Sequence, residues 1–171
     1  MPGARIRVTE GEVRFCEGPG TVLTAVLGSC IAACIHDPVA QVGGMNHFLL
    51  AGGDGRRSRS QERYGASLME VLINGLLARG ATRDNLQAKV FGGSSMIPGM
   101  GDIGRANAIF ASNFLLTEGI MQVGGSVGGI SARLVEYWPE TGRARQKFVQ
   151  RVVPVVDVAP PAEEAGLVEF F

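Results

Sequence analysis

Residues 21–38 read TVLTAVLGSCIAACIHDP, and this stretch decides how the surrounding sequence is interpreted. It is apolar on both sides of a break at Gly28 and Ser29. A short apolar run that ends at an Asp-Pro pair is typical of a buried strand followed by a turn. We therefore predict a buried strand at residues 31–35, with the apolar residues before the break leading into it.

Strand and helix patterns follow outside this stretch. Leucines repeat every fourth residue within residues 62–79, which predicts a helix that ends at Gly80. A second helix is predicted over residues 105–118. Apolar patterns predict further strands near residues 5–15, 42–50, 88–91, 120–123, 132–138 and 146–153. Two helices among about seven strands indicate an α/β sandwich in which helices cover sheet faces.

Glycine is unusually frequent, at 25 of 171 residues, or roughly 15% against a usual ~7%. In a chain that is 46% hydrophobic, this frequency indicates tight turns and close backbone approaches rather than disorder. The length suits one domain, which we place at residues 1–153. Residues 154–171 are acidic and contain prolines, so we expect them to form a flexible C-terminal tail.

Charge and hydropathy exclude several classes of partner. Lys plus Arg and Asp plus Glu both number 16, so the chain lacks the basic excess that nucleic-acid binding usually needs. No apolar run reaches the length of a membrane span. The N-terminal sequence also lacks the apolar core of a signal peptide, so we expect a cytoplasmic protein.

The three cysteines, Cys16, Cys30 and Cys34, form an odd set in a chain expected to be cytoplasmic, which argues against disulfides. Cys30 differs from the others because it directly follows the Gly-Ser break, where backbone N–H groups can approach a substrate oxygen. The alternative is a structural cysteine buried in the core, and we expect this for Cys16 and Cys34. A zinc site made by Cys30, Cys34 and His36 is disfavoured because no fourth ligand accompanies them.

His47 makes a catalytic role for Cys30 more attractive. It ends the sequence GGMNH, on a strand predicted to run beside the strand that follows Cys30. A separation of 17 residues suits a hairpin, so thiol and imidazole can meet, and the imidazole can remove the thiol proton. Thr24 is a candidate for the third group, orienting the imidazole through its hydroxyl. The alternative for His47 is a strand histidine bonded to backbone.

Several short motifs, spread along the chain, together indicate a family. They are TAVLGSC at residues 24–30, GGMNH at 43–47, RYG at 63–65, KVFGGSSM at 89–96, Ile103-Gly104 before the second helix, and the glycine pair at 124–125. Taken together and in this order, they resemble the CheD family of chemoreceptor glutamine deamidases. The resemblance covers roughly residues 5–150, and the pairing of LGSC with GGMNH is its most specific part.

The resemblance implies a fold and a reaction. The fold is a sandwich of two mixed or antiparallel β-sheets flanked by α-helices, as in glutamine-deamidating bacterial toxins. Cys30 is implied as nucleophile, His47 as base and Thr24 as the third member of a triad, with backbone around Gly28 and Ser29 receiving the oxyanion. The implied substrates are glutamines on the cytoplasmic helices of chemoreceptors, which become glutamates. The reaction needs no metal or organic cofactor, and the same groups could hydrolyse a glutamyl methyl ester.

Two alternative functions remain open. The resemblance also implies a CheC-type phosphatase as a partner, so the chain could act by binding rather than by catalysis. A redox-sensing thiol at Cys30 is the third possibility. The presence of all three implied triad residues favours the enzyme.

Substrate contacts are predicted around the site. Arg56 and Arg57 lie in the loop that follows His47, where they could attract acidic receptor helices. Met96 and Met100 lie in a glycine-rich loop and could form an adaptable apolar contact.

The sequence departs from the family pattern at two positions. Ala106 and Gly129 stand where the family usually has arginine. The implied catalytic residues are intact, so these departures bear on substrate choice rather than on the chemistry.

Overall fold

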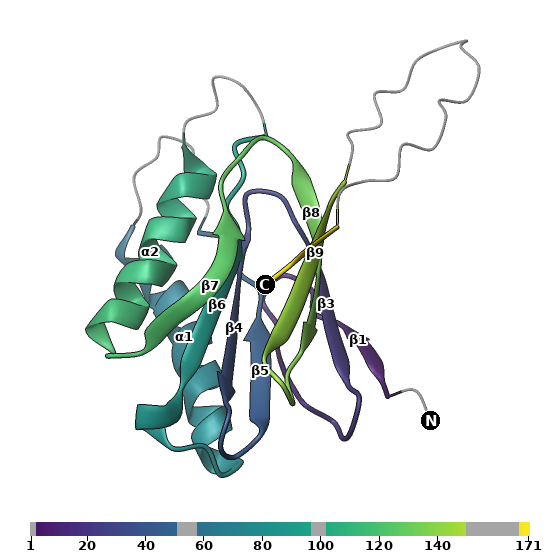
Figure 1. Cartoon of the computed structure of the whole chain (residues 1–171). Coiled ribbons are helices and arrows are strands. Elements are labelled where there is room, and N and C mark those ends of the chain that lie inside the picture. The colour runs from purple at the N-terminus through teal and green to yellow at the C-terminus, as the bar shows by residue number, and fades with distance from the viewer. Residues whose placement is uncertain (1–2, 51–57, 97–101, 150–167) are drawn as a thin grey trace, which may run out of the picture.

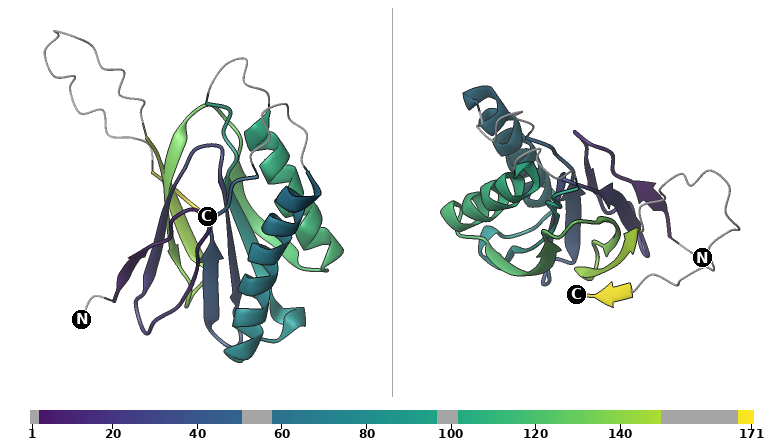
Figure 2. Two further views of the ribbon diagram at one scale, coloured as in Figure 1. Left: turned by 180° about the vertical axis from the view of Figure 1, so that it is seen from behind. Right: turned by 90° about the horizontal axis from the view of Figure 1, so that it is seen from above.

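Two β-sheets pack face to face, and two α-helices cover the outer face of one of them (Figure 1). The structure is a computed structural model that describes residues 3–50, 58–96, 102–149 and 168–171. Its layers are the helices, a central sheet and an outer sheet, as the view from above shows (Figure 2). The predicted α/β sandwich is confirmed.

Both sheets are mixed. The outer sheet, sheet A, has the strand order β1 (Arg5–Arg7), β3 (Val22–Leu27), β8 (Ala132–Trp138), β9 (Arg143–Val149) and β10 (Val168–Phe170). The central sheet, sheet B, has the order β2 (Val13–Phe15), β5 (Val42–Asn46), β4 (Ile31–Asp37), β6 (Gln87–Gly92) and β7 (Met121–Val127). The β1–β3 and β6–β7 pairs are parallel, and the other pairs are antiparallel.

Strand β4 lies in the middle of sheet B and is buried along its whole length. Ile31, Ala33 and Ile35 belong to the core between sheet B and the helices. Ala32 and Cys34, which alternate with them, belong to the core between the two sheets. Because both faces of β4 are covered, its sequence is apolar throughout instead of alternating with polar residues.

The helices are α1 (Arg59–Ala78) and α2 (Ile103–Thr117). Helix α1 packs against β5 and β2, whereas α2 packs against β6 and β7. Ser58 and Gln61 form a capping box at the start of α1, and a short 3-10 helix (Arg83–Asn85) precedes β6. Both predicted helices are confirmed, each beginning slightly earlier than expected. No helix in the described residues combines the length and apolar character that a membrane crossing requires.

The single strand predicted over residues 5–15 is wrong in one respect, since the chain forms two strands there in different sheets. Strand β1 pairs with β3 in sheet A, and β2 pairs with β5 in sheet B. The apolar segment before the Gly-Ser break is likewise a strand of its own, β3, in sheet A. Residue alternation identifies extended chain, but it does not say which strand will be the partner.

The C-terminal segment expected to be a flexible tail ends in an ordered strand. Strand β10 pairs with β9, and Phe171 exchanges backbone hydrogen bonds with Ala144. The Phe171 ring packs edge-on against Phe91 at a centroid distance of 5.6 Å. The Phe171 side chain thus packs against the sandwich, although the average composition of the segment is acidic. Residues 154–167 lie outside the described residues.

Candidate active site

The turn at residues 28–30, called the thiol turn here, carries the chain from β3 in sheet A to β4 in sheet B (Figure 1). All of its carbonyl groups accept hydrogen bonds from neighbouring segments. These are Gly28 O from the Ser94 N–H at 2.9 Å, Ser29 O from Asn107 Nδ2 at 2.9 Å, and Cys30 O from the Gly93 N–H at 2.8 Å. The loop after β6 and helix α2 therefore hold the thiol turn from one side.

Backbone approaches the thiol turn closely on that side. A Cβ on Gly92 would lie 2.1 Å from Cys30 O, and Gly92 has a φ of +106°, so only glycine fits there. Met96 also touches the turn, because a Cβ on Gly28 would lie 2.5 Å from the Met96 Sδ. Met96, one of the predicted substrate contacts, thus lies against the turn that carries the candidate nucleophile.

The N–H groups of Ser29 and Cys30 point the other way. A trans peptide directs its C=O and N–H to opposite sides, so these two N–H groups face away from Ser94 and Asn107. Within the described residues, neither group donates to another residue. They are therefore available to a substrate oxygen.

His47 and Cys30 lie on the same face of neighbouring strands. Ile31 and Phe48 exchange two backbone hydrogen bonds of 2.9 Å, and Cys30 and His47 directly precede these two residues. Since Ile31 and Phe48 face the helices, Cys30 and His47 both face sheet A, as diagonal neighbours. Such diagonal pairs have Cα atoms about 7–8 Å apart. The strand pairing thus places Cys30 and His47 on one face, and no hydrogen bond joins the Cys30 sulfur to the His47 ring in the described residues.

The His47 ring is held through one nitrogen. Its Nδ1 lies 2.9 Å from the backbone oxygen of Val8, and a carbonyl oxygen can only accept, so Nδ1 carries the proton. The Nε2 atom is buried and has no hydrogen-bond partner in the described part of the chain. The Nε2 lone pair is therefore free to accept a proton from a neighbouring group.

The loop at residues 8–12 wraps around His47. The Gly11 N–H donates to His47 O at 2.7 Å, and the His47 N–H donates to Glu12 O at 3.1 Å. The Val8 N–H donates to the backbone oxygen of Thr24 at 2.7 Å. The expected contact between the Thr24 hydroxyl and the imidazole does not appear among the described residues, because Val8 O occupies Nδ1 instead. Thr24 is linked to His47 only through its backbone oxygen and Val8.

The thiol of Cys30 lies in a partly buried, negatively charged environment. Burial raises the pKa of Cys30, and the charge of Glu10 raises it further, while the residue's own backbone N–H acts in the opposite direction. The Tyr64 hydroxyl donates to Glu10 Oε1 at 3.1 Å and holds that carboxylate in place. A thiol with a raised pKa needs a base in order to react as thiolate.

These groups together suit one kind of chemistry. A cysteine on the same sheet face as a histidine whose Nε2 has no partner suits a cysteine nucleophile that is activated by a base. Two N–H groups beside the sulfur are suited to receive the oxyanion that forms when a carboxamide or ester carbon is attacked. The arrangement can therefore perform acyl transfer through a thioester.

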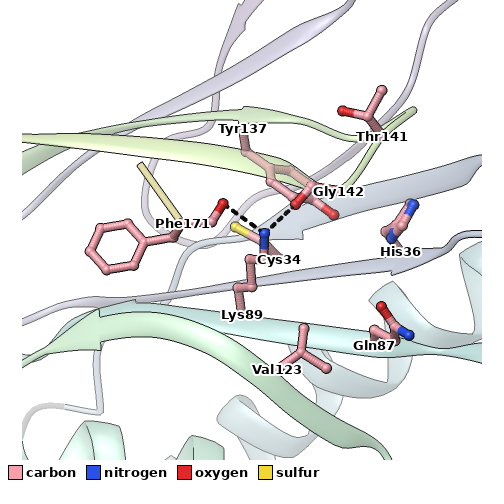
Figure 3. Close-up of a pocket in the computed structure, with 9 residues that line it drawn as sticks. All are labelled: Cys34, His36, Gln87, Lys89, Val123, Tyr137, Thr141, Gly142 and Phe171. Carbon is pink, nitrogen blue, oxygen red and sulfur yellow. Dashed lines mark hydrogen bonds between the residues drawn. The ribbon is translucent and has the colours of Figure 1, made fainter. Parts of the chain in front are cut away.

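A separate cavity of about 280 Å³ lies between the two sheets, and its lining includes neither Cys30 nor His47 (Figure 3). Lys89 extends into it and donates to the backbone oxygens of Gly142 at 2.7 Å and Phe171 at 2.8 Å. Cys34 lines the cavity but is almost fully buried, and this burial raises the pKa of its thiol strongly. Cys34 is therefore an unreactive core residue, as expected from its sequence context. The same expectation is wrong for Cys16, which is partly exposed because it lies just beyond the end of the short strand β2.

The disfavoured zinc site is not assembled. Cys30 precedes β4 and His36 lies near its other end, so the length of the strand, about 20 Å for six residues, separates them. In the residues that the structure describes, no group of three His, Cys, Asp or Glu side chains is arranged to hold a metal ion.

The other predicted contacts have mixed outcomes. Arg56, Arg57 and Met100 lie outside the described residues. Ala106 is partly exposed on the first turn of α2. At Gly129, a Cβ would lie 3.8 Å from Nη2 of Arg133, a buried arginine.

Arg133 is one of the residues that the sequence interpretation missed. Its guanidinium donates to Ser126 O at 2.7 Å, to Ser94 Oγ at 3.0 Å and to Gly128 O. It therefore braces the region around Gly129, where the expected arginine is missing. The available signal was a cationic residue inside the otherwise largely apolar strand sequence ARLVEYW. Val8 and Asn107 were missed as well, and no local sequence signal marks their contacts.

Comparison with known families gives a consistent result. The family model described as "CheD chemotactic sensory transduction" matches residues 49–148. A protein of Caulobacter vibrioides strain NA1000 / CB15N, named "Probable chemoreceptor glutamine deamidase CheD", is 51% identical over 98% of this chain and 93% of its own length. Proteins of the same name are 51% identical in Agrobacterium fabrum, over 98% of this chain and 96% of their length, and 53% identical in Sinorhizobium medicae, over 84% and 80%.

Solved structures give more distant matches. Neisseria meningitidis protein NMB0706, of family DUF152, aligns with a TM-score of 0.46 at 13% identity, over 75% of this chain and 64% of that one. Bacillus licheniformis protein YfiH aligns with a TM-score of 0.43 at 14% identity, over 73% and 60%.

Proposed function

The chain belongs to the CheD family, and we propose that it is a chemoreceptor glutamine deamidase whose nucleophile is Cys30 and whose base is His47. Its relatives across nearly the full chain carry that activity in their names. The assignment of these two residues goes beyond the names. It rests on the geometry of the thiol turn and of the histidine beside it.

One observation carries the proposal. His47 is fixed through Nδ1 by the Val8 carbonyl, while its buried Nε2 has no partner in the described residues and lies on the face that Cys30 shares. A purely structural histidine in a core is expected to have both ring nitrogens hydrogen-bonded, because an unpaired buried polar atom is costly. The unpaired nitrogen is therefore best explained by a role in accepting the thiol proton.

The first half of the reaction forms a thioester. His47 Nε2 takes the proton from the Cys30 thiol as the sulfur attacks the glutamine carboxamide carbon. The oxygen of the tetrahedral intermediate binds the N–H groups of Ser29 and Cys30. The intermediate then collapses, the C–N bond breaks, and the His47 imidazolium returns its proton to the leaving nitrogen, which departs as ammonia.

The second half restores the enzyme. His47 Nε2 takes a proton from water as the water oxygen attacks the thioester carbon, and the Cys30 sulfur leaves and is reprotonated. The products are a glutamate side chain and a free thiol, with no cofactor consumed. A glutamyl methyl ester would follow the same steps with methanol as the leaving group.

Thr24 contributes to this site as a positioning residue. Its backbone oxygen accepts a hydrogen bond from the Val8 N–H, and the Val8 carbonyl accepts one from His47 Nδ1. Thr24 therefore supports the orientation of the base indirectly, through Val8. The contact of Met96 with Gly28 supports a role for Met96 against the substrate helix, close to the attacked glutamine. The substrate is the cytoplasmic part of a chemoreceptor, which implies a cytoplasmic enzyme.

The test uses a soluble chemoreceptor fragment incubated with purified protein. Wild type is expected to release ammonia and to convert specific glutamines to glutamates, as detected by mass spectrometry of tryptic peptides. The Cys30→Ala variant is expected to release none. Cys16→Ala is the matched control, since Cys16 is also partly exposed but its sulfur bonds only to Gly18 O among the described residues, and it is expected to keep full activity.

Undiminished ammonia release by Cys30→Ala would refute the mechanism. Introducing both forms into cells that lack the protein separates catalysis from binding. Restoration of normal chemotaxis by Cys30→Ala would favour the alternative role, in which the chain binds receptors and a CheC-type phosphatase.

A further inference from the structure

Asn107 on helix α2 connects the two segments that carry the proposed nucleophile and base. It is fully buried. Its Nδ2 donates to Ser29 O at 2.9 Å, and its Oδ1 accepts the Leu50 N–H at 3.2 Å. One side chain thus joins the thiol turn to the chain that continues from His47.

The contact with Ser29 determines the direction of a specific N–H group. The carbonyl of Ser29 and the N–H of Cys30 belong to the same peptide unit, which is planar and trans. Holding the carbonyl toward Asn107 therefore turns the Cys30 N–H toward the opposite side, where the sulfur and the substrate meet. The Ser94 N–H acts in the same way on Gly28 O and so directs the N–H of Ser29.

Helix α2 reaches the thiol turn because its first turn contains glycine. A Cβ on Gly104 would lie 2.3 Å from Ser94 O, so backbone meets backbone at this contact. Asn107 follows three residues later and lies on the same face of the helix as Gly104. The approach at Gly104 is what brings the amide of Asn107 within hydrogen-bond distance of Ser29.

We propose that Asn107 is a positioning residue of the oxyanion hole, which orients the Cys30 N–H by holding the Ser29 carbonyl and couples this turn to the strand of the base. The inference rests on the proposed function, since it assigns a part in the same reaction. Asn107 does not touch the substrate. Its effect is on the transition state alone, where charge develops on the substrate oxygen.

The test compares two reactions of the same sulfur. Deamidation passes through an oxyanion, whereas alkylation by iodoacetamide displaces iodide from a tetrahedral carbon and forms none. Asn107→Ala removes the hydrogen bond to Ser29 without adding charge. The kcat for deamidation is expected to fall about 10- to 100-fold, less than the 10²–10³ typical of losing an oxyanion donor outright. KM and the rate constant of Cys30 alkylation are expected to stay near the wild-type values.

A second variant and a control accompany this measurement. Asn107→Asp keeps the shape and the acceptor for Leu50 but places an oxygen against Ser29 O. The loss of kcat is expected to exceed the slowing of alkylation that the added negative charge causes. If circular dichroism and thermal unfolding show that Asn107→Ala does not fold, Asn107→Asp alone provides the test. Asn113→Asp makes the same chemical change at an exposed position on the same helix and is expected to behave as wild type.

The possible results separate the role of Asn107 from the proposed deamidase function on which it rests. A folded variant that loses deamidation and alkylation in parallel would overturn the inference, because a general disturbance of the site would then be the cause. Variants that keep the wild-type kcat would overturn it as well. Wild-type protein that deamidates nothing would instead overturn the proposed function, and the inference with it.

Discussion

The Nδ1 atom of His47 lies 2.9 Å from the backbone oxygen of Val8. These residues are 39 positions apart in sequence, and the contact joins β5 in sheet B to the chain that leaves β1 in sheet A. It gives the imidazole one tautomer and one orientation. A backbone carbonyl thus acts on the histidine in the way that a side chain of a catalytic triad would.

Asparagine at position 47 is expected to separate this structural contact from catalysis. In His47→Asn, the side-chain amide nitrogen can occupy the place of Nδ1 and keep the bond to Val8, but nothing replaces Nε2. We expect near-native thermal stability and a loss of about 10²–10⁴ in kcat, the usual contribution of general acid–base catalysis. Differential scanning fluorimetry and ammonia release measure the two effects. Retained activity in a folded variant would exclude His47 as the base.

Glu10 is expected to set the pH at which Cys30 becomes reactive. Its negative charge raises the pKa of the Cys30 thiol, second to the effect of burial. Glu10→Gln therefore lowers that pKa and moves the pH profile of iodoacetamide alkylation toward lower pH. Because Glu10 is exposed, the shift should shrink as salt is added. Glu17→Gln, at another exposed site, is the control, and an equal shift there would contradict the assignment.

Cys34 is expected to make the fold sensitive to alkaline pH. Burial raises the pKa of its thiol in the folded protein far above the ordinary value of about 8.5. The unfolded chain therefore loses this proton first, and stability falls as pH rises past that value, by at most about 1.4 kcal/mol per pH unit. Cys34→Ala should lower stability by a constant amount near neutral pH but remove this part of the alkaline loss. Urea unfolding at several pH values tests it, with Cys16→Ala as control; an unchanged pH dependence in Cys34→Ala would contradict the prediction.

Alanine at position 104 is expected to push helix α2 away from the thiol turn. The new Cβ would lie 2.3 Å from Ser94 O and 2.5 Å from the Gly93 backbone, neither of which can move aside without disturbing residues 28–30. We expect Gly104→Ala to cost about 1–3 kcal/mol of stability and to reduce deamidation more than a general loss of stability would. In Gly124→Ala, the Cβ meets only Lys89 methylene groups at 3.7 Å or more, so this control should be mild. Equal effects of the two substitutions would refute the explanation.

Elements with a strong local pattern were predicted well from sequence. Leu68, Leu72 and Leu76 repeat at the helical period, and all three are buried in α1 as expected. Strand β4 was recognisable because both of its faces are covered, which leaves an uninterrupted apolar run. A hairpin connects Cys30 and His47, so their short separation in sequence was enough to predict that they lie on neighbouring segments of one sheet.

Elements defined by distant partners were not predictable in this way. The alternation over residues 5–15 is compatible with pairing to β3 or to β5, and the chain uses both by dividing into β1 and β2. The hydrogen bond from Asn107 to Ser29 spans 78 residues. Ser29 lies in the LGSC motif, but neither that motif nor the periodicity of helix α2 indicates that Asn107 is its partner.

Local patterns in the sequence identify both helices, most of the strands and the side chains that have the chemistry of a nucleophile and a base. Backbone preference and side-chain polarity are properties of each residue, so no partner is needed to recognise them. The division of residues 5–15 into two strands and the C-terminal strand depend instead on tertiary packing. So does the way the candidate side chains are held, with Val8 against His47 and Asn107 against the turn that carries Cys30. Hydrogen bonds between segments far apart in the chain form only after the sheets and helices have packed, because the packing alone brings their donors and acceptors within 3 Å.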